Sequence, residues 1–176
     1  MTDPNRLPNV RPLIANLPTE SGVVLRHFGQ SSMVEQATWL AKLCKRHRHI
    51  FLVAADPKLA RAVDAQGVHW PQARLSEARR WRGAFALQTA SAHNRRDIVA
   101  AHRAGMDAAL LSTVFPSNSP TAGRALGPLK LRSFAQDSPL SFYALGGVHA
   151  DNAGQIGTAT GFAMVEGATI FRNGDV

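Results

Sequence analysis

The chain has 176 residues, of which 45% are hydrophobic, and carries a formal net charge of +8 at pH 7. This length and hydrophobic content are enough for one sizeable core, so we expect a single domain over residues 1–176. No apolar run approaches the roughly 18 residues of a membrane-spanning helix, which argues against a membrane protein. Cys44 is the only cysteine and therefore cannot form a disulfide within the chain. We expect it to be a core residue in a protein of the reducing cytoplasm.

The excess of positive charge could indicate a nucleic-acid-binding protein. The basic residues are scattered, apart from clusters at 45–49 and 79–82, and both clusters fall at expected helix ends, where cations suit the helix dipole. Aromatic residues do not alternate with them as a base-stacking surface requires. We therefore expect solvated basic faces or the recognition of a small anionic substrate, and we regard nucleic acid as the weaker alternative.

Short apolar runs alternate with helical patterns along the chain. Seven runs are predicted to be strands, at 22–28, 50–54, 67–70, 84–89, 108–112, 142–145 and 161–165. Helices are predicted from 32, from 56, over 75–81, over 94–104, over 128–134 and after 147. Three of them carry end signals: Ser32 with Glu35 as a capping box, Asp56 as an N-cap before Pro57, and Gly105 as a C-terminal stop.

Strands that alternate with helices indicate βαβ units and a parallel sheet. No Gly-x-Gly-x-x-Gly sequence follows the first strand, which disfavours a dinucleotide-binding Rossmann fold, and no Walker A sequence is present. We expect an α/β fold of the (β/α)8 TIM-barrel type, with functional residues in the loops after the strands. The chain is short for such a barrel, whose typical length is about 250 residues.

The segment 142–149, Phe-Tyr-Ala-Leu-Gly-Gly-Val-His, is a candidate ligand site. Its apolar strand ends in Gly146 and Gly147, which let backbone N–H groups approach a ligand, and a following helix start adds partial positive charge. Phosphate is the ligand that suits this arrangement best, and a simple turn is the alternative. Its place as the penultimate strand of a barrel favours phosphate.

Several segments, in order along nearly the whole chain, resemble thiamine-phosphate synthase and its relative, the thiazole tautomerase. They are 22–28, Gly-Val-His-Trp-Pro-Gln at 67–72, Ser-Ala-His-Asn at 91–94, Ala-Gly-Met-Asp at 104–107, Val-Phe-Pro-Ser-Asn-Ser at 114–119 and Ala-Leu-Gly-Gly-Val at 144–148. The resemblance implies a TIM barrel and places residues 1–3, Met-Thr-Asp, at the end of the family's first strand. We therefore expect most of that strand to be missing, through truncation or a start codon assigned too late.

The resemblance implies a reaction of thiamine biosynthesis, in which hydroxymethylpyrimidine diphosphate is coupled to thiazole phosphate and pyrophosphate is released. The pyrimidine becomes carbocation-like as pyrophosphate departs, and the thiazole nitrogen attacks it. Mg²⁺, cations and hydrogen-bond donors stabilise the charge of the leaving group. The implied partners are these phosphorylated small molecules, with a homo-oligomer left open and neither a membrane nor nucleic acid implied.

The resemblance assigns catalytic roles at the diphosphate to Arg26 and Ser91. It assigns phosphate binding to Ser117, Ser119, Gly146, Gly147, Glu166 and Gly167. Glu166 replaces a serine of the family, and its carboxylate would repel a phosphate if it pointed inward. The tautomerase's histidine aligns near Thr113, so the resemblance does not imply tautomerase activity.

The metal site is where this sequence departs most from the family. The family's Asn-Asp pair aligns on Ala54 and Ala55, with Asp56 one residue late, and the second metal aspartate aligns on Arg74. Asp56 is thus the one candidate ligand for Mg²⁺, with an N-cap as its alternative role. Arg74 is a candidate to replace the positive charge of the metal.

The other assignments also have structural alternatives. Arg26 suits a salt bridge at the barrel end as well as it suits a phosphate contact. Ser117 and Ser119 suit a turn equally well. We expect His69 and His93 to be structural hydrogen-bonding groups.

Two functions are consistent with these features. The first is a divergent thiamine-phosphate synthase, and the second is a barrel that binds thiazole phosphate or thiamine phosphate without coupling anything. The retained phosphate loops fit both functions, whereas the altered Mg²⁺ positions favour the second.

Overall fold

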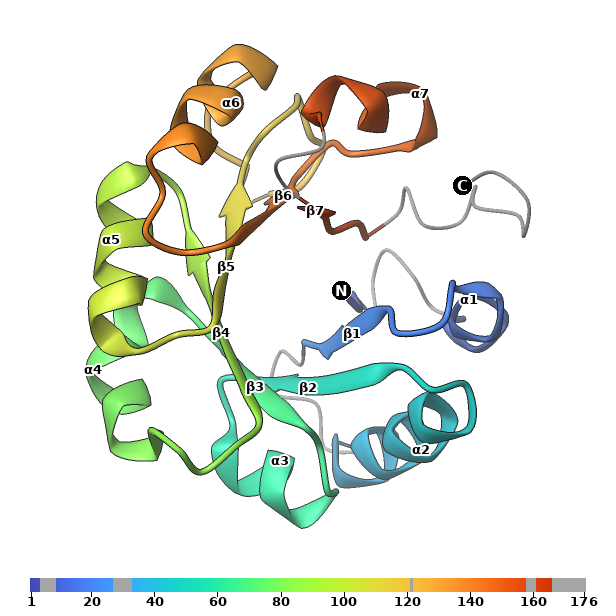
Figure 1. Ribbon diagram of the computed structural model, residues 1–176. Coiled ribbons are helices and arrows are strands. Elements are labelled where there is room, and N and C mark those ends of the chain that lie inside the picture. The colour runs from blue at the N-terminus through green and yellow to red at the C-terminus, as the bar shows by residue number, and fades with distance from the viewer. Residues whose placement is uncertain (4–8, 27–32, 121, 158–160, 166–176) are drawn as a thin grey trace.

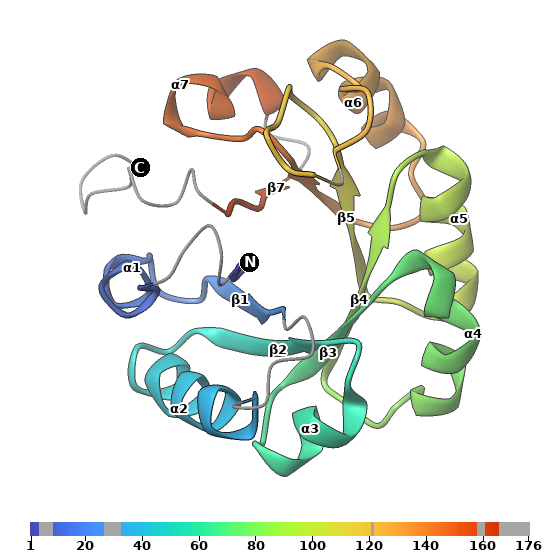
Figure 2. The same cartoon turned by 180° about the vertical axis from the view of Figure 1, so that it is seen from behind.

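The computed structural model describes residues 1–3, 9–26, 33–120, 122–157 and 161–165. Its strands are β1 (Gly22–Leu25), β2 (Ile50–Ala54), β3 (Gly67–Trp70), β4 (Leu87–Ala92), β5 (Ala108–Ser112), β6 (Phe142–Leu145) and β7 (Gly161–Phe162). Each strand pairs in parallel with the next one along the chain. The resulting sheet curls into an incomplete barrel with the helices outside it, as Figures 1 and 2 show from opposite sides.

The helices follow the strands in the order that βαβ units require. They are α1 (Arg11–Asn16), α2 (Met33–Arg46), α3 (Pro57–Ala62), α4 (Leu75–Ala78), α5 (Arg95–Ala104), α6 (Pro128–Gln136) and α7 (Ala150–Ala153), with 3-10 turns η1 (Gln72–Arg74), η2 (Arg79–Trp81) and η3 (Gly154–Ile156). The predicted TIM-barrel-like α/β fold is confirmed. Among the described residues, no helix is both long enough and apolar enough to cross a membrane.

All seven predicted strands are present, but β4 lies three residues later than predicted. The segment 84–86 bends, with Ala84 N–H donating to Trp81 O at 3.0 Å. The ladder with β3 begins where Leu87 pairs with Gly67, so the position of β4 follows its neighbour in the sheet. Ser91 therefore lies within a strand.

The local end signals of the helices are largely confirmed. The Asp56 side chain caps α3, and Pro57 is its first residue. Gly105 ends α5 in the left-handed conformation, at φ 80°. The predicted helix over 75–81 is divided between α4 and η2. Ser32, the first half of the predicted capping box, lies outside the described residues.

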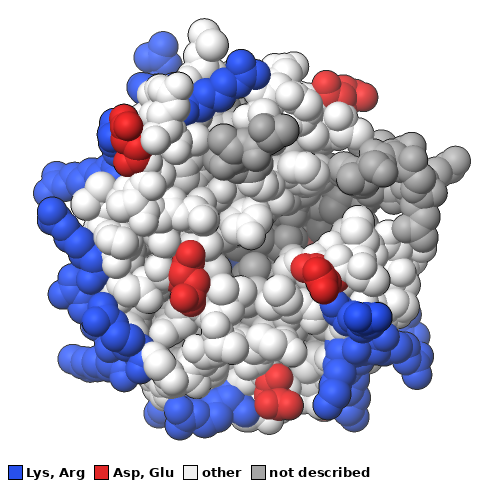
Figure 3. Space-filling view, viewed as in Figure 1, with Lys and Arg blue, Asp and Glu red and all other residues white. Residues whose placement is uncertain are grey.

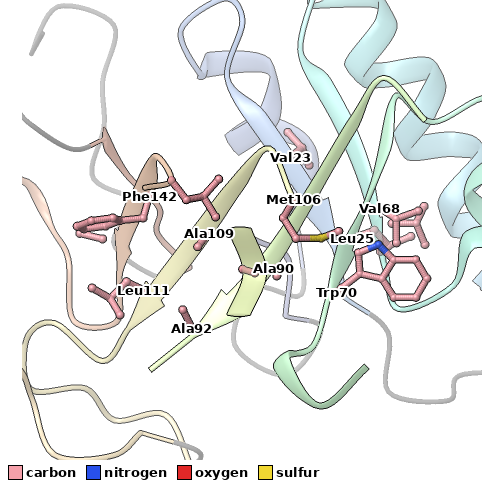
Figure 4. Packing of buried hydrophobic residues seen from close by; sticks show 14 of the residues in the cluster. Val23, Leu25, Val68, Trp70, Ala90, Ala92, Met106, Ala109, Leu111 and Phe142 are labelled. Atoms are coloured by element: carbon pink, nitrogen blue, oxygen red, sulfur yellow. The ribbon is translucent and has the colours of Figure 1, made fainter. Parts of the chain in front are cut away.

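The hydrophobic core lies between the strands and the outer helices. Alternate strand residues point outward into it, including Val23, Leu25, Val68, Trp70, Ala90, Ala92, Ala109, Leu111 and Phe142 (Figure 4). The intervening residues, such as His69 and Thr89, face the inside of the curled sheet. Cys44 belongs to the core, and burial raises the pKa of its thiol to about 12, so it is an inert apolar side chain.

Residues 1–3 lie between the two edge strands of the sheet. Thr2 N–H donates to Val24 O of β1 at 2.9 Å, and the Met1 nitrogen donates to Met164 O, just after β7, at 2.8 Å. These bonds place Met-Thr-Asp where the resemblance predicted the end of the first barrel strand.

Candidate functional site

The predicted site residues gather at one end of the sheet. Parallel strands direct their carboxyl ends to the same edge, and ligand sites of barrels form there from the following loops. Arg26 follows β1, Ser91 lies near the end of β4, and residues 117 and 119 belong to the loop after β5. Gly146 and Gly147 follow β6 directly. Glu166 and Gly167, which were assigned to the same phosphate site, lie outside the described residues.

The loop after β5 and the loop after β6 are joined by backbone hydrogen bonds. Val114 N–H donates to Leu145 O and Phe115 N–H donates to Gly146 O, each at 3.0 Å. The two ends of the loop after β5 are also joined, since Gly127 N–H donates to Val114 O at 2.9 Å. We refer to residues 113–116 and 146–147 as the interlocked loops.

The two glycines are required by this interlock. Gly146 and Gly147 have φ values of +89° and +65°, which favour glycine. A Cβ on Gly146 would lie 2.8 Å from Thr113 Cγ2. A Cβ on Gly147 would lie 2.7 Å from Phe115 O and closer still to Pro116 O. The absent side chains therefore make room for the neighbouring loop, and phosphate binding by this backbone stays a prediction.

The helix after the glycines contributes less than the sequence suggested. α7 has four residues, too few for a substantial helix dipole. Its start is instead fixed by side chains, because Asn152 Oδ1 accepts from His149 N–H at 2.9 Å and Asn152 Nδ2 donates to Gly147 O at 2.8 Å.

Ser117 has a part in the local turn. Its Oγ accepts from Ser119 N–H at 3.3 Å, which agrees with the turn-forming role. Both residues are partly exposed. An accepting hydroxyl keeps its own hydrogen, so Ser117 can still donate to a phosphate oxygen.

Arg26 makes the salt bridge that was the alternative to a phosphate contact. Its Nη2 lies 2.8 Å from Asp3 Oδ2, and its Nε donates to Thr2 O at 3.0 Å. Its backbone N–H donates to Thr2 Oγ1 at 3.0 Å. Arg26 thus binds residues 1–3 to β1, and its contact with a diphosphate remains a prediction.

A buried hydrogen-bonded group joins β3 to β4 inside the curled sheet. His69 Nδ1 lies 2.9 Å from Thr89 Oγ1, and His69 Nε2 lies 2.9 Å from Ser91 Oγ. His69 is 3% exposed, and burial, followed by nearby positive charge that includes Arg26, lowers the pKa of its ring to about 4. The imidazole is therefore neutral at pH 7. This contact of His69 with the predicted site residue Ser91 was not predicted from the sequence.

His93 also has the hydrogen-bonding role that was expected of it. Its exposed ring places Nδ1 at 3.0 Å from Ser112 O, so Nδ1–H donates to that carbonyl. The bond ties the end of β4 to the end of β5.

The described residues do not fit the Mg²⁺ site that the family implies. Asp56 Oδ1 accepts from Leu59 N–H at 2.9 Å as the cap of α3. Arg74 Nη1 donates to Ala55 O at 2.6 Å, and its guanidinium forms a bidentate pair with Glu77 at 2.8 and 2.7 Å. No group of three or more His, Cys, Asp or Glu side chains suited to a metal ion occurs in the described part of the chain.

The capping role of Asp56 can be tested by substitution. Asp56→Ala should lower the free energy of unfolding by about 1 kcal/mol, because Leu59 N–H loses its acceptor. Asp56→Asn retains an acceptor and should remain within about 0.5 kcal/mol of the wild type. Urea denaturation measures both differences. Asn94→Ala, which removes the matching cap of α5, is the control and should also cost about 1 kcal/mol. An Asp56→Asn variant as unstable as Asp56→Ala would contradict the capping role.

The basic residues do not gather in the centre of the face seen in Figure 3. Lys and Arg side chains project there from the periphery, while the described residues nearer the centre of this face are mostly uncharged, with a few Asp or Glu side chains among them. This distribution agrees with the expected solvated basic faces on the outer helices.

The curled parallel sheet, its outer helices and the loops at the carboxyl ends of its strands define a TIM-barrel-like protein. Its fold is similar to that of the thiamine phosphate pyrophosphorylase from Pyrococcus furiosus, with a TM-score of 0.73 and 22% sequence identity over 93% of this chain and 82% of that one. The sequence model of the thiamine monophosphate synthase family matches residues 21–168. The chain belongs to this family.

Curated relatives agree with the family match. The chain is 38% identical over 136 residues to the thiamine-phosphate synthase of Thioalkalivibrio sulfidiphilus, covering 74% of this chain and 63% of that protein. It is 36% identical to the thiamine-phosphate synthase of Chromobacterium violaceum, covering 69% of this chain and 60% of that protein. For the thiamine-phosphate synthase of Methanosarcina barkeri the identity is 34%, covering 68% of this chain and 56% of that protein. The chain thus spans about three-fifths of the length of the curated relatives that it matches.

Proposed function

We propose that this protein is a thiamine-phosphate synthase, which couples hydroxymethylpyrimidine diphosphate to thiazole phosphate and releases pyrophosphate. The observation that carries the proposal is the extent of the family match. It covers residues 21–168 and therefore includes the loops after β1, β4, β5 and β6 that bear the candidate residues.

The proposed reaction exchanges one bond for another at the exocyclic carbon of the pyrimidine. The bond from this carbon to the diphosphate oxygen breaks, and its electron pair leaves with pyrophosphate. The lone pair of the thiazole nitrogen then forms the new carbon–nitrogen bond. Since negative charge develops on the leaving group, hydrogen-bond donors and cations at that position lower the barrier.

In this proposal the Ser91 hydroxyl donates to the departing pyrophosphate, and Arg26 supplies positive charge on the same side of the sheet. Ser117, Ser119 and the Gly146–Gly147 backbone bind the thiazole phosphate. Because the described residues do not fit a carboxylate-held Mg²⁺, these roles are assigned to the protein's own groups.

A non-catalytic binding protein is the second candidate. The observation that favours it is the pairing of the two aligned metal positions: Asp56, after β2, caps a helix, and Arg74, in η1 after β3, is paired with Glu77. Such a protein would bind thiazole phosphate or thiamine phosphate and form no new bond.

One assay separates the two candidates. The protein is incubated with both substrates, with and without Mg²⁺, and thiamine phosphate and pyrophosphate are quantified. The synthase proposal expects both products in equal amounts, and Ser91→Ala should lower kcat/KM by about 10- to 100-fold, since a hydrogen bond to a charged group is lost. Saturable binding of thiazole phosphate without turnover in either condition would support the binding protein and contradict the synthase.

A further inference from the structure

The buried group of His69, Thr89 and Ser91 has one arrangement of its hydrogens that satisfies every buried donor. Thr89 and Ser91 are two residues apart on β4, so their side chains lie on the same face of the strand. The imidazole of His69, on the neighbouring strand, bridges the two hydroxyls with two contacts of 2.9 Å. A neutral imidazole donates from one nitrogen and accepts at the other, so the two hydroxyls must have opposite roles.

Thr89 decides between the two tautomers. This residue is 6% exposed, and among the described residues its hydroxyl has one hydrogen-bond partner, His69 Nδ1. If Nδ1 carried the proton, the buried Thr89 hydrogen would have no acceptor, which is unfavourable in an interior. If Nε2 carries it, Thr89 O–H donates to Nδ1, and Nε2–H donates to Ser91 Oγ.

The favoured tautomer has a consequence for Ser91. Its oxygen accepts from His69, so its own O–H does not donate to either of the other two residues of the group. Ser91 is partly exposed, unlike the other two residues, and lies towards the carboxyl end of β4. The chain of donors therefore runs from Thr89 through His69 to Ser91 and ends in an O–H that can be given to a ligand.

We propose that His69 is a positioning residue, which Thr89 holds as the Nε2–H tautomer so that the Ser91 hydroxyl donates to a phosphoryl oxygen of a diphosphate. The proposal rests on the proposed function in its choice of ligand, whereas the tautomer is a property of the protein alone. In the opposite tautomer, the Ser91 O–H would donate to His69 Nε2 and present only its oxygen lone pairs to an anion. The Ser91 oxygen would then repel the phosphoryl oxygen instead of binding it.

The tautomer is measured directly by ¹⁵N NMR of the imidazole nitrogens in the ligand-free protein at pH 7, with the His69 signals assigned by their loss in His69→Gln. We expect the pattern of a neutral ring protonated at Nε2. Thr89→Val removes the donor to Nδ1 and should shift the ring towards the Nδ1–H form. A wild-type ring protonated at Nδ1, or a Thr89→Val spectrum identical to that of the wild type, would overturn the proposal.

Calorimetric titration with inorganic pyrophosphate tests the consequence for binding. Ser91→Ala should weaken binding by about 10- to 100-fold, and Thr89→Val should weaken it in the same direction although Thr89 does not reach the ligand. Combining both substitutions should add nothing to Ser91→Ala alone, since both act through one hydroxyl. Additive losses, an unchanged affinity in Thr89→Val, or a wild type that does not bind pyrophosphate would each overturn the proposal.

If the Thr89→Val protein does not fold, two variants of His69 test the same proposal. His69→Gln keeps an N–H donor for Ser91, whereas His69→Leu does not. We expect His69→Gln to retain most of the pyrophosphate affinity and His69→Leu to match Ser91→Ala. Equal affinities in the two His69 variants would contradict the positioning role.

These results are independent of the coupling assay. A protein that shows the Nε2–H tautomer and Ser91-dependent pyrophosphate binding but no turnover would retain the inference and lose the proposed function. A protein that turns over while its His69 is protonated at Nδ1 would retain the function and lose the inference.

Discussion

A Gly147→Ala variant should lose about 2–5 kcal/mol of its free energy of unfolding. The left-handed conformation at φ +65° costs an alanine about 1–2 kcal/mol, and forcing a methyl group against Phe115 O and Pro116 O adds about 1–3 kcal/mol. Both contacts are to backbone carbonyls, which cannot rotate away. Chemical denaturation measures the loss, and pyrophosphate or thiazole-phosphate binding to the folded fraction measures any effect on the site.

Gly154→Ala provides the matched control for this substitution. Gly154 follows α7 in the same connection between β6 and β7, has φ −59°, and a Cβ there would meet nothing within 4 Å. The variant should therefore be as stable as the wild type or more stable by up to about 1 kcal/mol. Equal stability of Gly147→Ala and the wild type would show that the loops are not interlocked in solution.

Acidification should destabilise the protein through His69. Its pKa is about 4 in the fold against 6.5 for an ordinary histidine, so below pH 6.5 the unfolded chain takes up a proton that the folded protein does not. The contribution of this group is fully present above pH 6.5 and is lost as the pH falls from 6.5 towards 4. One pKa unit corresponds to about 1.4 kcal/mol, so the loss approaches about 3 kcal/mol at pH 4 and is about 2 kcal/mol at pH 5.

Urea denaturation of the wild type and of His69→Gln at pH 7 and pH 5 isolates this effect. The wild type should lose about 2 kcal/mol more than the variant between the two pH values, because glutamine does not titrate. His102→Gln, at an exposed position of α5, should retain the wild-type pH dependence. If His69→Gln retained the full wild-type pH dependence, the imidazole would not be held neutral by its surroundings.

The strands and most helix ends were predictable because their signals are local. Apolar runs located all seven strands, and the caps of α3 and α5 depend on side chains that lie within four residues of the amides they bind. The position of β4 was wrong by three residues because its register is set by pairing with Gly67 on β3. Periodicity within one segment carries no information on such a partner.

The positions of the candidate residues in the fold were predictable, but their contacts were less so. The residue types and their order placed Arg26, Ser91 and the two glycines at strand ends, which the fold brings to one edge. The bonds from Arg26 to Asp3 and from His69 to Ser91 join residues 23 and 22 positions apart. Only the bond from His69 to Ser91 had a signal in the sequence. Two hydroxyl residues, Thr89 and Ser91, lie two positions apart on one strand, and the strand before it carries His69.

The interlocked loops also restrict how this barrel can be altered. Because Gly147 has room for no side chain and Phe115 N–H depends on Gly146 O, neither loop can be replaced on its own. A transplant of 113–127 from a relative would have to bring the relative's counterpart of 146–147 with it. The two loops can therefore be replaced only together. We expect changes in ligand preference at this edge of the sheet to involve substitutions in both loops.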